Sequence, residues 1–284
     1  MALKKIFFQS SLPRSGSTYM QCVLASNPNI YAGGTDGCLE LLFGARGNYQ
    51  TSPEFKAQDA TLMKGAFKDF CRAGLEAYSS ALIKDTDKEY VVLKSRGWGV
   101  YRDFLNEFYP DPKIICMIRD LRDVFCSYEK LYRKNQLAGD PIRNDAEARG
   151  TTVYKRMDEW AHPQNTIGRA IERLTEIIAL GYANKILFVK YEDFCLRPET
   201  EMTRIYQYLG IPYYAHDFDN IPQTVKEEDT VFGMGDLHTI RPKLKMLPSD
   251  AKSVLGNDVC KWITGNAPQG GGFGWFYDYF KYQR

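Results

Sequence analysis

The sequence of 284 residues lacks an excess of charge of either sign. Lys and Arg together number 37 and Asp and Glu number 35, which gives a formal net charge of +2. Proteins that coat DNA or RNA carry a strongly basic surface, so this near balance argues against a nucleic-acid partner. Any anion site in the chain must therefore be local and built from a few well-placed cations.

Paired cysteines and long apolar runs are also missing. The seven cysteines are scattered, with no Cys-x-x-Cys pair, so we expect neither a disulfide framework nor a metal site, and a reducing compartment. No stretch reaches the roughly 18 apolar residues of a membrane span, and the first residues hold no signal-peptide core. The sequence predicts a cytoplasmic protein with no membrane segment.

Short apolar runs alternate with amphipathic stretches along most of the chain. The runs are rich in β-branched and aromatic residues, as in strands buried on both faces, and lie at 6–8, 90–93, 113–118 and 185–189. Helical patterns lie at 19–25, 54–82, 98–109, 121–136, 153–181 and 198–209. This alternation predicts an α/β fold with a central parallel sheet flanked by helices.

The periodicity weakens after Pro212, where Gly and Pro punctuate the sequence. No internal repeat, composition break or flexible linker divides the chain. We therefore expect a single domain over 1–284, with a core at about 5–212 and a loop-rich segment at 213–284.

The segment 13–18, Pro-Arg-Ser-Gly-Ser-Thr, follows the first expected strand and opens a helix. A helix N-terminus offers unpaired N–H groups and the positive end of its dipole to an anion, and Gly16 lets the backbone approach closely. Side chains add further donors: Arg14, Ser15, Ser17 and Thr18. A plain capped helix start is the alternative interpretation.

The glycine-rich loop of nucleotide triphosphatases, G-x-x-x-x-G-K-[ST], does not fit this segment. Position 11 is serine, and Gly16 is followed by Ser17 where that loop has lysine. The missing lysine would reach the β- and γ-phosphates, and the following hydroxyl would hold Mg²⁺. The segment thus suits a single terminal phosphate without a metal, and a nucleotide kinase or phosphatase stays the weaker alternative.

A second candidate phosphate site begins at Arg119, at the end of another expected strand, where ligands bind in open α/β sheets. Ser127 lies eight residues later, just over two helical turns, so it can share a face with the helix start. The alternative interpretation is a surface cluster of ion pairs among Arg119, Asp120, Arg122 and Asp123.

These two motifs, followed by Phe-Val-Lys-Tyr-Glu-Asp-Phe at 188–194 and Tyr-Gln-Tyr-Leu-Gly-Ile-Pro at 206–212, resemble the sulfotransferases over roughly residues 5–212. These enzymes use 3′-phosphoadenosine 5′-phosphosulfate (PAPS) and release 3′-phosphoadenosine 5′-phosphate (PAP). The resemblance implies that segment 13–18 binds the 5′-phosphosulfate and that Arg119 and Ser127 bind the 3′-phosphate, with no metal required. The resemblance also implies an α/β fold like that of the P-loop nucleotide hydrolases, with residues 5–212 as the donor-binding core.

Two further parts of the donor site follow from the same resemblance. Tyr191 matches the family tyrosine that lies near the adenine. The segment 237–242, Leu-His-Thr-Ile-Arg-Pro, is similar to the C-terminal loop that closes over the donor. There Arg241 replaces a phosphate-binding lysine, with Lys243 as a weaker candidate, so 213–284 is expected to close over the donor and acceptor sites.

The catalytic groups are less well matched. Lys94 corresponds to the lysine near the leaving phosphate in the cytosolic sulfotransferases. Arg96 stands where those enzymes have a histidine base, and an arginine stays protonated. His238 is interpreted first as a surface-loop histidine, with a role as base left open.

The resemblance to the tyrosylprotein sulfotransferases offers another base. They also carry Pro-Arg-Ser-Gly and place a glutamate some twenty residues after its arginine. Asp36 lies 22 residues after Arg14 and is the first candidate, with Glu40 second. The alternative for Asp36 is a helix cap before Cys38.

The sequence thus predicts a PAPS-dependent sulfotransferase that moves a sulfuryl group in line to a hydroxyl or amine. The acceptor, a small molecule or a peptide, is not readable from the sequence. Apart from a nucleotide kinase, the alternative is a non-catalytic PAP-binding module, which Arg96 in the place of the base would explain.

Overall fold

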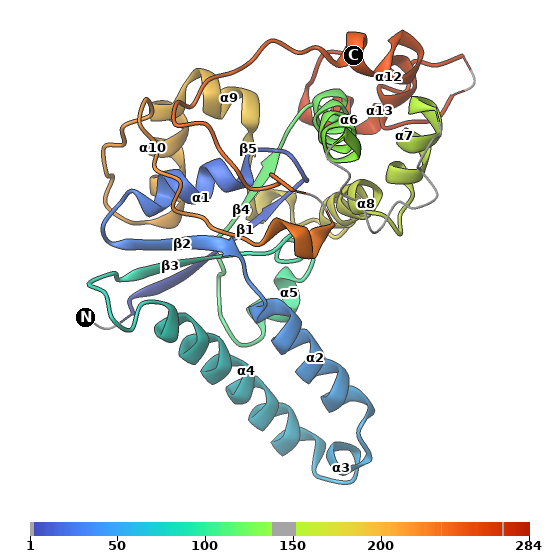
Figure 1. Cartoon of the computed structure of the whole chain (residues 1–284). Coiled ribbons are helices and arrows are strands. Elements are labelled where there is room, and N and C mark those ends of the chain that lie inside the picture. Colours follow the sequence, from blue (N-terminus) through green and yellow to red (C-terminus); the bar gives the residue numbers. More distant parts are fainter. Residues whose placement is uncertain (1–2, 138–151, 234, 269) are drawn as a thin grey trace.

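The computed structural model describes residues 3–137, 152–233, 235–268 and 270–284. Its centre is a parallel sheet with the strand order β2-β3-β1-β4-β5 (Figure 1). The five strands are β1 Lys5–Ser11, β2 Ile30–Thr35, β3 Tyr90–Lys94, β4 Ile114–Ile118 and β5 Leu187–Lys190. The predicted α/β fold with a central parallel sheet is confirmed.

Helices follow every strand and cover both faces of the sheet (Figure 1). The first half of the chain forms α1 Ser17–Ala25, α2 Cys38–Thr51, α3 Pro53–Lys56, α4 Ala60–Leu82, α5 Arg102–Asn106 and α6 Leu121–Leu137. The second half forms α7 Val153–Ala161, α8 Thr166–Ala179, α9 Tyr191–Leu196, α10 Pro198–Leu209, α11 Ala251–Leu255, α12 Asn257–Ile263 and α13 Gly274–Phe280. Short 3₁₀ turns lie at Ala183–Lys185 and Asp229–Phe232.

The alternation of side chains along β1 separates two apolar cores. Ile6 and Phe8 face the core that is shared with α5, α6, α8 and the last three helices. Phe7 faces the other core, which is built by α1, α9 and α10. Because helices cover both faces, each central strand contains an uninterrupted buried apolar run, such as Ile6-Phe7-Phe8 in β1, which is why the sequence pattern located these strands correctly.

The helical pattern over 153–181 corresponds to two helices, α7 and α8, which are separated at Pro163, a residue that cannot continue an α-helix. Two expectations about secondary structure are wrong. The helix predicted over 98–109 is only α5. The edge strand β2 was not predicted, since Gly33 and Gly34 break its apolar pattern, and its pairing with β3 shifts register between Ala32 and Thr35.

The C-terminal segment is partly as expected. The described residues between 213 and 250 form no α-helix or strand, but α11, α12 and α13 follow, where the sequence predicted loops. These helices pack on α6 and α7 through apolar and aromatic side chains. Ion pairs add to this contact, such as Lys130 with Asp250. The aromatic residues after the glycines of the tail are therefore core residues.

The hairpin of α2, α3 and α4 projects away from the sheet (Figure 1). Aromatic stacking inside it, as between Tyr49 and Phe67 at 4.4 Å, holds the helices together. No helix within the described ranges is both long enough and apolar enough to cross a membrane.

Candidate active site

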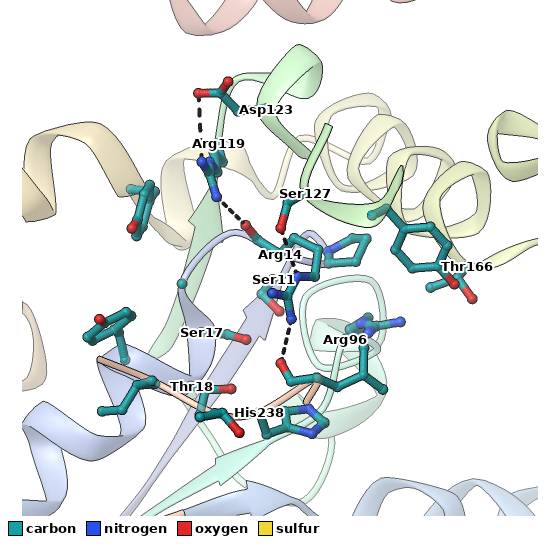
Figure 2. A pocket seen from close by; sticks show the side chains of 18 of the residues that line it. Ser11, Arg14, Ser17, Thr18, Arg96, Arg119, Asp123, Ser127, Thr166 and His238 are labelled. Carbon is teal, nitrogen blue, oxygen red and sulfur yellow. Dashed lines mark hydrogen bonds and ion pairs between the residues drawn. The ribbon is translucent and has the colours of Figure 1, made fainter. Parts of the chain in front are cut away.

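A cavity of about 780 Å³ opens at the carboxyl end of the strands. Its walls come from the loops after β1, β3 and β4, from the start of α1, and from residues 231–250 of the C-terminal segment (Figure 2). In a parallel sheet these strand ends meet at one edge. The fold therefore brings the motifs predicted from the sequence into one place.

The loop after β1 has the backbone of an anion cradle. Arg14 and Gly16 both have positive φ, 56° and 82°, and α1 begins at the next residue, with Ser17 and Thr18 lining the cavity. A Cβ on Gly16 would lie 2.4 Å from the ring of Tyr191. Glycine is thus required here by both the backbone angle and the space.

One hydroxyl of the predicted cradle is used elsewhere. The Ser15 side chain is fully buried and donates a hydrogen bond of 2.6 Å to the carbonyl of Leu12. Since a hydroxyl has one proton to donate, Ser15 stabilises the turn and its side chain does not line the cavity. The expected donor role of its hydroxyl does not agree with this geometry.

The structure brings Arg14, Arg119 and Ser127 together. Nε of Arg14 donates to Oγ of Ser127 at 3.1 Å, and Nη1 of Arg119 donates to the carbonyl of Arg14 at 3.1 Å (Figure 2). The guanidinium of Arg119 also lies 4.5 Å from the ring centre of Tyr191. Residues that follow β1, β4 and β5 thus meet in one cluster with Ser127 of α6.

This cluster fits an anion of the kind that PAP carries. Burial, and then the charge of Arg119, lower the pKa of Arg14. The positive charges of these two arginines are therefore not fully neutralised by nearby carboxylates. The nearest carboxylate of Arg119 is Asp123, at 3.7 Å, and Nε of Arg119 is buried with no hydrogen-bond partner. An unsatisfied buried donor beside two cations is costly unless a ligand pairs with it.

The ion pairs of the alternative interpretation of the second motif are present for all four residues. Arg119 pairs with Asp123, and Asp120 pairs with Arg122. Tyr277 of α13 donates to Asp120 at 2.9 Å, which attaches the C-terminal helices to the sheet. Arg119 and Asp123 line the cavity, whereas Asp120 and Arg122 do not.

Lys94, at the end of β3, lines the cavity and forms an ion pair with Glu227 at 3.3 Å. Their side chains are 7% and 8% exposed. Burial lowers the pKa of Lys94, and the charge of Glu227 opposes this shift. Glu227 also accepts a hydrogen bond from the backbone N–H of Thr35, so it ties the C-terminal segment to β2 and β3.

His238 lies in the cavity wall and is oriented by two carboxylates. Nδ1 is 2.5 Å from Oδ1 of Asp229, and Nε2 is 3.5 Å from Oε1 of Glu227. Burial, followed by the charge of Lys94, lowers the pKa of His238. The carbonyl of the preceding residue, Leu237, accepts a hydrogen bond from Arg14, which joins this loop to the cradle.

Glu227 and Asp229 were not predicted as functional residues. They lie in the acidic run Glu-Glu-Asp at 227–229, which has the appearance of a solvated surface stretch. The bond to His238 depends on a loop that returns over the sheet, and no local spacing indicates such a return.

The two carboxylates predicted as bases have different environments. Oδ1 of Asp36 accepts a hydrogen bond of 2.9 Å from the N–H of Cys38 at the start of α2, which is the cap interpretation. Burial raises the pKa of Asp36 to about 6, but the residue does not line the cavity, whereas Glu40 does. A role of either residue in catalysis stays a prediction.

Of the two C-terminal cations, Arg241 lines the cavity and Lys243 does not. The backbone N–H of Arg241 donates to the hydroxyl of Tyr19 at 2.9 Å, which places it over the first turn of α1. Lys243 pairs with Asp219 at 2.6 Å. The geometry thus supports Arg241 as a residue that contacts bound PAPS, whereas Lys243 forms a surface ion pair.

No cluster of three or more His, Cys, Asp or Glu side chains suited to a metal ion occurs among the described residues. The expectation that no metal is required stays a prediction.

The family model for sulfotransferases matches residues 7–215, which include segment 13–18, Arg119, Ser127 and Tyr191 but not segment 237–242. The chain belongs to the sulfotransferase family. The resemblance inferred from the motifs is thereby confirmed.

Two sequence relatives of this sulfotransferase are protein-tyrosine sulfotransferases. The Drosophila melanogaster enzyme is 22% identical over 280 residues, covering 89% of this chain and 52% of its own. Protein-tyrosine sulfotransferase A of Caenorhabditis elegans is 24% identical over 212 residues, covering 72% and 50%. This chain thus spans about half the length of these curated relatives.

Among solved structures, the sulfotransferase domain from the curacin biosynthetic pathway has a similar fold. Its TM-score is 0.58 at 17% identity, with 100% of this chain and 99% of that chain covered. A likeness at this identity concerns the fold.

Proposed function

We propose that this chain transfers a sulfuryl group from PAPS to a hydroxyl or amine acceptor and releases PAP. The bond between sulfur and the phosphate oxygen of the donor breaks, a bond from sulfur to the acceptor atom forms, and the acceptor loses its proton to a base. The observation that carries this proposal is the cluster of Arg14, Arg119 and Ser127 in one cavity with Lys94.

The donor's two ends would be held by different parts of the cavity wall. Ser17, Thr18 and the N–H groups at the start of α1 suit the 5′ end. Arg119 and Ser127 suit the 3′-phosphate, because a guanidinium and a hydroxyl offer several donors to one phosphate. Tyr191 is proposed beside the adenine, and Arg241 over the phosphates.

Lys94 is proposed to stabilise the charge that develops on the leaving oxygen. Its ammonium group is buried and held in place by Glu227, and a fixed cation in a water-poor site stabilises developing charge more than a mobile one does.

We propose His238 as the base that accepts the proton of the acceptor, in place of the carboxylates that the sequence favoured. The bond from Nδ1 to Asp229 keeps Nε2 as the proton acceptor. Glu227, 3.5 Å from Nε2, would stabilise the imidazolium that results. A lowered pKa keeps the ring neutral and able to act as a base near neutral pH.

A non-catalytic PAP-binding module was an alternative because Arg96 occupies the position of the base in the cytosolic sulfotransferases. The proposed role of His238 provides a base from the C-terminal segment and so argues against that alternative. A cytoplasmic location and an acceptor of either size stay predictions, as does the absence of a membrane or nucleic-acid partner.

The test combines calorimetry with PAP and transfer of labelled sulfate from PAPS to a panel of phenols, alcohols and amines. We expect saturable binding of PAP by the wild-type chain without divalent cations. Arg119→Ala and Arg14→Ala should weaken it by at least about 100-fold, since each removes a charged donor from a desolvated anion. Arg197→Ala, at an exposed ion pair with Asp193, is the matched control. No heat from wild-type protein at micromolar concentration would refute the proposal.

A further inference from the structure

A second hollow of about 290 Å³ adjoins the large cavity on the side of α8. The two cavities share Arg96, Thr166 and Arg173 in their walls. In Figure 2, Arg96 and Thr166 appear on one side of Arg14, and Ser17 and Thr18 appear on the other. The hollow therefore opens away from the cradle assigned to the 5′ end of the donor.

Three cations surround this hollow: Arg96, Arg169 and Arg173. Across the ranges that the structure describes, none of the three has a carboxylate within ion-pair distance. Arg173 is close enough to Arg96 for their like charges to repel each other. Arg169 donates only to the carbonyl and side-chain oxygen of Gln164.

This arrangement is unusual for a surface that has no ligand. Most other arginines of the described chain pair with a carboxylate, as Arg122 does with Asp120 and Arg204 with Glu201. Glu172 and Glu176 lie on the same helix as Arg169 and Arg173 but form no ion pair with them. Glu227, which pairs with Lys94, offsets part of the charge of Arg96 from a longer distance. The convergence on a concave surface of three cations that form no ion pair with a described residue favours binding of an anion.

We propose that this hollow binds an oxyanion carried by the acceptor: a carboxylate, sulfate or phosphate group near the hydroxyl or amine that is sulfated. This inference rests on the proposed function, because the hollow is connected by its shared wall to the cavity in which sulfuryl transfer is proposed. Arg96 follows Lys94 by two residues, so an anion held there would lie beside the end of the cavity where the sulfuryl group is proposed to react.

An acceptor-anion site also explains why position 96 is an arginine where the cytosolic sulfotransferases have a histidine. In the proposed scheme the base comes from the C-terminal segment as His238, which frees position 96 for acceptor recognition. A guanidinium suits this role because it holds an oxyanion through two parallel hydrogen bonds and stays charged at every physiological pH.

The test follows the guanidinium N–H signals of ¹⁵N-labelled protein by NMR during titration with inorganic phosphate. PAP is present at saturation, so that the donor's own phosphate sites are filled, and ionic strength is kept constant with NaCl. We expect saturable shifts in a subset of arginine signals. R96Q/R173Q and, separately, R169Q should weaken the phosphate affinity by at least about tenfold, as expected for loss of a charge-assisted hydrogen bond.

Two comparisons make the outcome decisive. R169Q lies outside the large cavity and should keep the PAP affinity of the wild type, which shows that the variant is folded. K64Q, on the projecting hairpin, removes one charge and should leave the phosphate response unchanged. If PAP binds but phosphate produces no saturable shift, or if R169Q and R96Q/R173Q respond as wild type does, the acceptor-anion site is refuted while the proposed function stands. Failure of PAP to bind would instead refute the proposed function.

Discussion

The two halves of the cavity wall are built on different principles. The half that contains Arg14, Lys94 and Arg119 consists of residues at the ends of adjacent parallel strands, positioned by the backbone pairing of β1, β3 and β4. The half that contains His238 and Arg241 belongs to 213–250, where the residues that the structure places form no strand or α-helix.

The irregular half is held by polar contacts to the regular one. Glu227 bonds to Lys94 and to the N–H of Thr35, and the hydroxyl of Tyr19 accepts from the N–H of Arg241. Gln223 spans the loop, donating to the carbonyl of His238. The position of the strand-end half is thus fixed by the backbone pairing of the sheet. The position of the half that closes over it depends on a few polar side chains, each of which can be tested by substitution.

The largest effect is expected at the closing half, from His238→Asn. Loss of a general base costs about 10²–10⁴-fold in rate, while PAP affinity should change little because the strand-end half is intact. For the wild type, kcat/KM should rise with pH as His238 loses its proton. Since its pKa is lowered, that rise should be centred below 6.5, and it should disappear in the variant.

The controls for this experiment are Asp36→Asn and Glu40→Gln, the bases that the sequence favoured. We expect kcat/KM of both variants to rise with pH as it does in the wild type. If Asp36→Asn or Glu40→Gln abolishes transfer and His238→Asn does not, the assignment of the base returns to the strand-end half.

A smaller effect is expected from Glu227→Gln, which breaks the connection between the two halves. Removing one partner of a buried ion pair costs about 3–5 kcal/mol, because the other charge is left buried without compensation. Chemical denaturation should show this loss of stability, and limited proteolysis should cleave within 223–245 faster than in the wild type. Glu228→Gln, next to it in the chain, is the matched control. Unchanged proteolysis would show that the segment is held by other contacts.

The smallest effect is expected in the strand-end half, from Gly16→Ala. An alanine at φ +82° costs about 1–2 kcal/mol, and its Cβ would displace the ring of Tyr191. We expect about a tenfold loss of PAP affinity, measured by calorimetry. Gly37→Ala, which meets no atom within 4 Å and precedes α2, is the control. If Gly16→Ala binds PAP as the wild type does, the loop does not need its left-handed backbone to hold the donor.

The strand-end half was largely predictable from sequence. Arg119 follows β4 directly, and Arg14 and Gly16 lie in the short turn between β1 and α1, so local patterns were sufficient to place them at one edge of a parallel sheet. The hydroxyl of Ser15 was predicted to bind the phosphosulfate but donates to the carbonyl of Leu12, because the sequence does not show which hydroxyl the turn itself uses. The edge strand β2 was missed because its glycines hide the pattern that marks the buried strands.

The closing half was predicted only in part. The resemblance implied that segment 237–242 lies over the donor site with Arg241 in it, but the contacts that fix this segment join residues far apart in the chain. His238 was interpreted first as a surface-loop histidine, with a role as base left open, and only the folded chain shows Asp229 and Glu227 around its ring. The three arginines of the second hollow likewise come from the loop after β3 and from α8, which no motif connects.

For this chain, the sequence alone determined the α/β class, the buried strands and the anion-binding motifs, because each depends on residues adjacent in the chain and on the geometry of a strand followed by a helix. The tertiary structure decided which side chains surround the reacting end of the cavity. Those positions depend on where an irregular segment lies against the sheet, which is set by the sum of many individually weak and distant contacts.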